Sequence, residues 1–139
     1  MVVQESGTRA TIIEKAKALF IQHGYHGLSM REIAEKVGVS KPALYYHFRD
    51  KEELFSAVLS SGLEEIGSRI DSISHQPVTS STKISMFMDY ILTQPTEQRA
   101  VIRLGTQEIA QLSPASRQKF NEFYNRQFIG KLREMIQTG

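Results

Sequence analysis

The 139-residue sequence contains no cysteine. Disulfide bonds and thiolate metal sites are therefore excluded, and we expect a cytoplasmic protein. Hydrophobic residues make up 40% of the chain, as in folded globular proteins, but no run approaches the roughly 18 apolar residues of a membrane span. The N-terminus lacks a charged region followed by an apolar core, so we expect neither a secretory signal nor a membrane partner.

The motifs of catalysis are missing as well. The sequence has no glycine-rich phosphate loop, no nucleophile elbow and no convincing pair of carboxylates, so we expect no catalytic residues, no cofactor and no enzyme. His23 and His26 stand three residues apart, as metal ligands can. No carboxylate or thiolate cluster accompanies them, so we expect no metal site.

Charge is unevenly distributed although the net charge is only +2. Residues 1–51 carry eight Lys and Arg against five Asp and Glu, whereas residues 52–139 carry nine against ten. The modest positive excess therefore lies in the N-terminal part, where a polyanion would bind.

That part contains two short predicted helices joined by a tight turn. Ser29 can cap the first helix, and Glu32 completes a capping box. Gly38 ends it, because a left-handed residue is cheapest without a Cβ atom. Ser40 can cap the second helix, and Pro42 is tolerated in its first turn. These features predict a helix-turn-helix, whose second helix lies in the DNA major groove.

The second helix of this pair has two different faces. Leu44 and Phe48, four residues apart, point inward together with Val39. The face left outside is cationic at one end and aromatic in the middle, and it has no acid before Asp50, which favours DNA binding. Its side chains are those of Lys41, Pro42, Ala43, Tyr45, Tyr46 and His47.

Residues 11–59 strongly resemble the TetR/AcrR family of bacterial transcriptional regulators. The motifs that carry the resemblance are Thr-Ile-Ile-Glu-Lys-Ala-Lys-Ala-Leu-Phe, Ile-Ala-Glu-Lys-Val-Gly-Val-Ser and Leu-Tyr-Tyr-His-Phe-Arg-Asp-Lys. The resemblance implies an all-α protein with a three-helix DNA-binding head, which we place at residues 8–51, and a helical ligand-sensing domain at residues 52–139. It also implies a homodimer that binds a palindromic double-stranded operator and most often represses transcription until a small molecule releases it.

Site residues are carried over from the family position by position. The resemblance implies base contacts from Lys41, Pro42, Ala43 and Tyr45. It implies contacts to the DNA backbone from Tyr46, His47 and Lys51, contacts to a base or phosphate from Arg31, and phosphate contacts from the capping serines Ser29 and Ser40. The alternatives are a position partly in the core for Tyr45 or Tyr46, a satisfied surface histidine for His47 and a merely solvated Lys51.

Helical spacing continues through the rest of the chain. We predict an N-terminal helix from Ser6 or Thr8 to His23 after a loose arm, and a long connector over residues 53–73. Three more helices are expected at 82–93, 97–112 and from Ser113 onward. Inward positions of the helix at 82–93 are Ile84, Phe87, Ile91 and Leu92. Residue types suited to an effector pocket are Met86, Phe87, Met88, Tyr90, Arg103, Gln107, Phe120, Phe123 and Tyr124, but the ligand-binding residues stay unknown.

Family members usually continue for two more long helices, which form the dimer. We therefore expect residues 52–139 to be an incomplete sensing domain. The alternative function is a helical protein-interaction module that does not bind DNA and uses the phenylalanine-rich last helix as its contact face.

Overall fold

The computed structural model describes the backbone of residues 2–137 and the side chains of residues 8–96 and 98–137. Over the described backbone it contains helices and no strand, which confirms the predicted all-α class. The elements in chain order are α1 (Val2–His23), α2 (Met30–Val37), α3 (Lys41–His47), α4 (Lys51–Ser74), α5 (Ser80–Leu92), α6 (Thr96–Glu108), the 3-10 turn η1 (Ile109–Gln111), α7 (Pro114–Tyr124), the π-helical segment η2 (Asn125–Ile129) and α8 (Gly130–Gln137).

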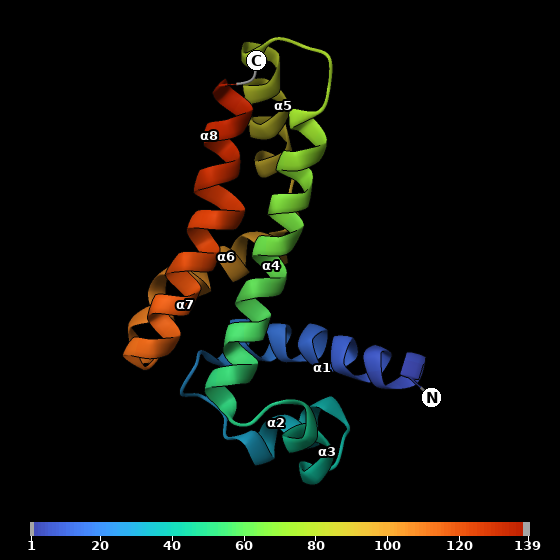
Figure 1. Ribbon diagram of the computed structural model, residues 1–139. Coiled ribbons are helices and arrows are strands. Elements are labelled where there is room, and N and C mark those ends of the chain that lie inside the picture. Colours follow the sequence, from blue (N-terminus) through green and yellow to red (C-terminus); the bar gives the residue numbers. More distant parts are fainter. Residues whose placement is uncertain (1, 138–139) are drawn as a thin grey trace.

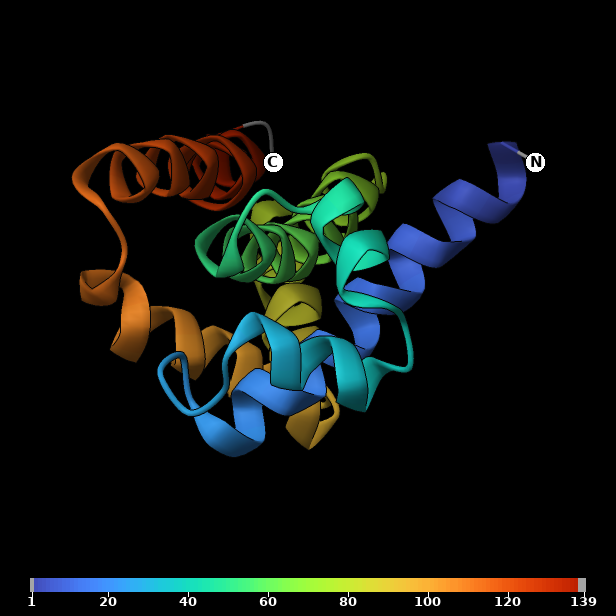
Figure 2. The same ribbon diagram turned by 90° about the horizontal axis from the view of Figure 1, so that it is seen from below.

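Helix α4 is the axis of the molecule (Figure 1). Its first turns rest on α1, while α2 and α3 lie below α1 at the same end. Further along, α4 packs against α6 and α7, and its last turns lie beside α5 and α8. Viewed from below, the first turns of α1 extend beyond the other helices (Figure 2). The three N-terminal helices therefore form a head at one end of the long connector.

The start of α1 differs from the prediction. The helix begins at Val2 rather than at Ser6 or Thr8, so most of the expected loose arm is helical; Met1 lies outside the described residues. Residues 2–6 contain no proline, and Gly7 costs only about 1 kcal/mol inside a helix, which is too little to end it.

Two hydrophobic cores share α4. The first joins the head to the start of α4 and to α6, with Phe20, Leu44, Phe48 and Phe55 all fully buried. The second lies at the far end and contains Ile66, Ile70, Ile73, Phe87 and Met135. The predicted stripe along α4 is thus buried, and apolar packing continues without a break past residue 51.

Helix α5 buries fewer side chains than expected. Phe87 is buried and Ile91 half-buried, but Ile84 and Leu92 are 42% and 66% exposed, so the inward placement of these two was wrong. The helix packs mainly against α4 and α8, which cover only one narrow face of it among the described residues.

The last predicted helix is interrupted by η2, which packs on α4. Gly67 of α4 permits this approach, because a Cβ atom there would collide with the side chain of Gln127. Lys131 then bonds to Asp71 at 2.6 Å, which fixes the start of α8 on α4. In the part of the chain that the structure describes, no helix combines the length and apolarity required to cross a bilayer.

Candidate DNA-binding surface

The turn between α2 and α3 has the geometry that its sequence predicts. The hydroxyl of Ser29 accepts from the backbone N–H of Glu32 at 3.2 Å, and the Glu32 carboxylate accepts from the backbone N–H of Ser29 at 3.2 Å. The hydrogen bonds that the backbone N–H and the hydroxyl of Ser29 donate to the Glu32 carboxylate lower the pKa of Glu32. Gly38 has φ 90° and ψ 30°, and its N–H donates to the carbonyl of Ala34. The left-handed corner therefore ends α2 where the sequence requires.

Helix α3 is fixed by its inner face. The Ser40 hydroxyl accepts from the backbone N–H of Ala43 at 3.1 Å, and Pro42 occupies the first turn. Leu44 and Phe48 are fully buried in the first core. Because the helix has only seven residues, these two anchors determine which side chains remain outside.

The outer face of α3, here called the reading surface, consists of Lys41, Pro42, Ala43, Tyr45, Tyr46 and His47. Tyr46 is 72% exposed and Tyr45 43%, and both are outside the hydrophobic core. Lys41 and Pro42 are exposed, while Ala43 and His47 are half-buried.

Ring contacts give the reading surface its shape. The Lys41 ammonium lies 6.0 Å from the centroid of the Tyr45 ring, and the Tyr46 and His47 rings meet edge to face at 5.0 Å. Among the described residues, none of these four side chains makes a hydrogen bond or an ion pair. Their polar groups are consequently available to an external partner.

The flanking candidates are accessible to different degrees. Arg31 is exposed, with its nearest acid Glu35 at 3.6 Å. The Ser29 hydroxyl already donates to Glu32 at 3.1 Å, whereas the Ser40 hydroxyl only accepts. A hydroxyl has one hydrogen to donate, so Ser40 can cap α3 and donate to a phosphate at the same time.

Lys51 is engaged within the protein. Its ammonium donates to the carbonyl of Leu28 at 3.2 Å and lies 4.5 Å from the centroid of the Tyr25 ring. Burial lowers the pKa of Lys51. The side chain is therefore half-buried and not simply solvated, and it ties the start of α4 to the loop between α1 and α2. Its contact with the DNA backbone stays a prediction.

Two basic residues of α1 also reach the helix pair. The Arg9 guanidinium lies 5.0 Å from the centroid of the Phe48 ring, at the end of α3. Lys15 donates to the carbonyl of Val37 at the end of α2. Sequence reasoning missed these contacts, since they join residues more than twenty positions apart.

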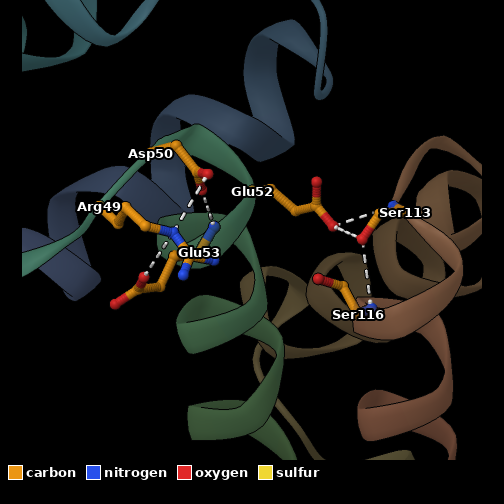
Figure 3. Close-up of polar contacts among 6 residues, drawn as sticks. All are labelled: Arg49, Asp50, Glu52, Glu53, Ser113 and Ser116. Carbon is orange, nitrogen blue, oxygen red and sulfur yellow. Dashed lines mark hydrogen bonds and ion pairs between the residues drawn. The ribbon is translucent and has the colours of Figure 1, made fainter.

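Polar bonds connect the first turn of α4 to the start of α7 (Figure 3), and the head to α6. Glu52, in the first turn of α4, accepts from the backbone N–H of Ser113 at 2.9 Å and from its hydroxyl at 2.6 Å. These bonds, the hydroxyl bond first, lower the pKa of Glu52. Tyr25 donates its N–H to Glu108 of α6 at 3.4 Å. The sequence did not reveal these links either.

A cavity of about 230 Å³ lies between α4, α5, α6 and α7. Its walls are mostly apolar and include Leu59 and Leu63 of α4 and Val101 of α6. Of the nine residues suited by type to an effector pocket, only Phe120 and Tyr124 line this cavity. Others are exposed elsewhere, Met88, Arg103 and Gln107 among them. Residue type alone could not select the wall, because which residues line the cavity depends on how the four helices cross.

The two helices bury their inner faces, and the second helix exposes a partly cationic outer face. This arrangement defines a helix-turn-helix DNA-binding domain. Residues 12–58 match the profile of the family described as bacterial regulatory proteins, tetR family. The family identified from the sequence is thus confirmed: this chain carries the DNA-binding domain of the TetR family.

Among curated proteins, the chain is 42% identical over 62 residues to the transcriptional activator FasR of Mycolicibacterium smegmatis, covering 45% of this chain and 28% of FasR. It is 46% identical over 50 residues to the transcriptional repressor AcnR of Corynebacterium diphtheriae, covering 36% of this chain and 26% of AcnR. The chain thus matches less than a third of the length of either relative. These similarities favour a DNA-binding regulator over the interaction module.

Solved structures extend the likeness beyond the DNA-binding domain to most of the chain. The TetR-family regulator PfmR of Thermus thermophilus superposes with a TM-score of 0.77 at 27% identity, covering 92% of this chain and 69% of PfmR. A putative fatty acid metabolism regulator of Clostridium perfringens gives 0.75 at 26%, covering 92% and 68%. AibR, solved with isovaleryl coenzyme A and operator DNA, gives 0.75 at 23%, covering 92% and 69%, and shows the fold alone.

Proposed function

We propose that this protein is a sequence-specific DNA-binding transcriptional regulator. The observation that carries the proposal is the reading surface, whose polar side chains have no partner among the described residues while the opposite face of α3 is fully buried. Residues 8–51 would bind DNA and residues 52–139 would regulate that binding.

The reading surface divides into two roles. A DNA-binding protein neutralises phosphates, which supplies salt-dependent affinity, and reads base edges, which supplies specificity. Lys41 can donate to guanine O6 and N7, and Pro42 and Ala43 suit a thymine methyl group. Tyr46 and His47, together with Ser40, would hold phosphates, and Arg31 would contact a base or phosphate.

One head covers only a few base pairs, so we propose that two copies act together. Two heads related by a two-fold axis would read a palindrome with half-sites about 34–36 Å apart or somewhat more. The homodimer is part of this proposal.

DNA titrations with single variants test the reading surface. We expect Lys41→Ala to weaken binding to the selected operator and to relax base preference, because base contacts carry the sequence information. We expect Tyr46→Phe to weaken binding to operator and scrambled DNA alike, since a phosphate contact is independent of sequence.

The operator is first selected from random or genomic fragments. Glu64→Gln, on the exposed side of α4, is the control. Equal losses for both variants on both DNAs would reject this division of roles.

The cavity is the proposed effector site. Thr106 of α6 lines it, and Glu108, two residues further along the same helix, accepts from Tyr25 of the head. A ligand that shifts α6 would therefore shift the head, changing the spacing of two heads on DNA. AibR, a structural neighbour solved with an acyl coenzyme A and its operator, supports a small-molecule effector as a class. Repression relieved by ligand is the proposed outcome.

A further inference from the structure

The polar groups of the cavity indicate which ligand chemistry it accepts. This inference rests on the proposed effector function of the cavity and concerns its chemical selectivity. None of the described residues that line the cavity is an Asp, Glu, Lys or Arg. A charged ligand of either sign would therefore lose its hydration without gaining a counter-charge from these residues.

The side-chain amide nitrogen of Gln98, on α6, already donates a hydrogen bond within the protein. The nitrogen donates to the carboxylate of Glu65 on α4. An ionised carboxylate only accepts hydrogen bonds, so the amide orientation is fixed by chemistry. No described residue donates to the remaining carbonyl oxygen of Gln98. That oxygen keeps both lone pairs, and the negative charge of Glu65 lies behind the amide.

Gln94 and Thr106 repeat this pattern. Gln94 donates its amide nitrogen to the carbonyl of Tyr90 at 3.1 Å, and the Thr106 hydroxyl donates to the carbonyl of Ile102 at 3.1 Å. Backbone carbonyls only accept, so these donors are also committed. Each glutamine retains one N–H and two lone pairs, while Thr106 retains lone pairs alone. Acceptor capacity in these three residues thus exceeds donor capacity, while the amide of Asn121 and the hydroxyl of Tyr124, which also line the cavity, can both donate and accept.

We propose that the cavity binds a small, uncharged hydrophobic molecule whose polar group donates a hydrogen bond, an alcohol, and discriminates against charged groups such as carboxylates, phosphates and alkylammonium ions. Apolar side chains such as Leu63, Ile66 and Val101 contact the hydrocarbon part. The carbonyl oxygens of Gln94 and Gln98 accept from the hydroxyl group. The volume of about 230 Å³ suits a small ligand, since drug-sized sites occupy roughly 300–1,000 Å³.

Three probes with the same alkyl chain test this selectivity: 1-octanol, octylamine and octanoate. Each competes for the protein with the neutral dye N-phenyl-1-naphthylamine, whose fluorescence reports apolar binding. We expect octanol to displace the dye at concentrations about tenfold or more below those needed for octanoate or for octylamine, both of which are charged at neutral pH; this factor corresponds to about 1.4 kcal/mol. Octanoate or octylamine competing equally well would overturn the proposal, and so would a failure of all three probes to displace the dye.

Substitutions of Gln98 and Gln94 test whether these lining residues cause the selectivity of the cavity between ligands. Gln98→Leu removes the acceptor and should reduce the preference for octanol over octanoate while keeping dye binding. Gln94→Leu should act in the same direction. Gln107→Leu, an exposed residue of α6 that does not line the cavity, should leave the preference unchanged. A preference that survives both Gln98→Leu and Gln94→Leu would overturn the assignment.

DNA affinity measured on the same samples separates this inference from the proposed function. Selective binding of octanol with unchanged operator affinity would reject the effector role but support the selectivity. Octanoate that binds as tightly as octanol and alters operator affinity would reject the selectivity but support the regulator.

Discussion

The bonds between Glu52 and Ser113 predict a measurable coupling between α4 and α7. Glu52 accepts two hydrogen bonds from Ser113, whose hydroxyl also caps α7 by accepting from the backbone N–H of Ser116. Hydrogen bonds to a charged group contribute about 1.5–3 kcal/mol where solvent is excluded. Glu52 is half-buried and Ser113 exposed, so solvent screening reduces the expected coupling to about 1 kcal/mol.

A double-mutant cycle isolates this coupling from the capping role. Ser113→Ala alone removes the cap and the hydroxyl bond and should cost about 1–2 kcal/mol. Glu52→Gln alone should cost about 1 kcal/mol. The double variant should lose less free energy of unfolding than the two single variants lose together. The difference, measured by urea unfolding at pH 7, is the coupling energy.

The pH dependence follows from the direction of the pKa shift. Hydrogen bonds from Ser113 lower the pKa of Glu52 in the folded protein, so the folded state favours the ionised carboxylate. This stabilisation is fully present above the unfolded pKa of about 4.3 and is lost as pH falls through the folded pKa. The coupling should therefore persist at pH 7 and pH 5 and shrink below about pH 4.

The control pairs Ser113→Ala with Glu64→Gln, an exposed carboxylate on the same helix as Glu52. These two changes should be additive at every pH. Complete additivity of Glu52→Gln and Ser113→Ala at pH 7 would refute the reasoning, because it would mean that the link stabilises nothing.

Three further substitutions test the packing. Gly38→Ala should lower the free energy of unfolding in urea by about 1–2 kcal/mol because the φ of 90° is left-handed; the space around Gly38 is open, so no steric clash adds to this cost. Gly38→Asn should cost less, and equal stability of the wild type and both variants would contradict this reasoning. Gly67→Ala should destabilise by more than about 1 kcal/mol, the cost of overpacking, since its Cβ atom would meet Gln127, and thermal unfolding would register the loss. Lys51→Met should lower stability by about 1 kcal/mol through the lost bond to Leu28, and it should make the salt dependence of DNA binding shallower if Lys51 contacts a phosphate as predicted; an unchanged salt slope would contradict that contact.

Much of the head was predictable because its signals are local. A serine cap, a glutamate three residues later and a glycine at the corner act within one helical turn, so the sequence places α2 and α3 correctly. Helical spacing places Leu44 and Phe48 on the inner face of α3, and the other side chains of that helix are therefore left on its exposed face. The stripe along α4 was equally readable for the same reason.

The sequence-based predictions failed where the burial of a side chain depends on which other helices pack against it. Ile84 and Leu92 have apolar side chains at helical spacing, yet α5 meets mainly α4 and α8 over one narrow face. The wall of the cavity could not be chosen by residue type, because Gln98 becomes a lining residue only through the crossing of α6 and α4. The internal bond of Lys51 likewise depends on the path of a loop twenty-three residues earlier.

By itself, then, the sequence determined the helical class, the helix-turn-helix and the family to which that head belongs. Each of these depends on residues within a few positions of one another, where backbone geometry leaves few choices. Only the tertiary structure decided that Glu52 holds Ser113, that Glu108 reaches the head, and that Gln94, Gln98 and Thr106 line one cavity. Those contacts join segments far apart in the chain, and their distances are set by the packing of whole helices, which no local pattern encodes.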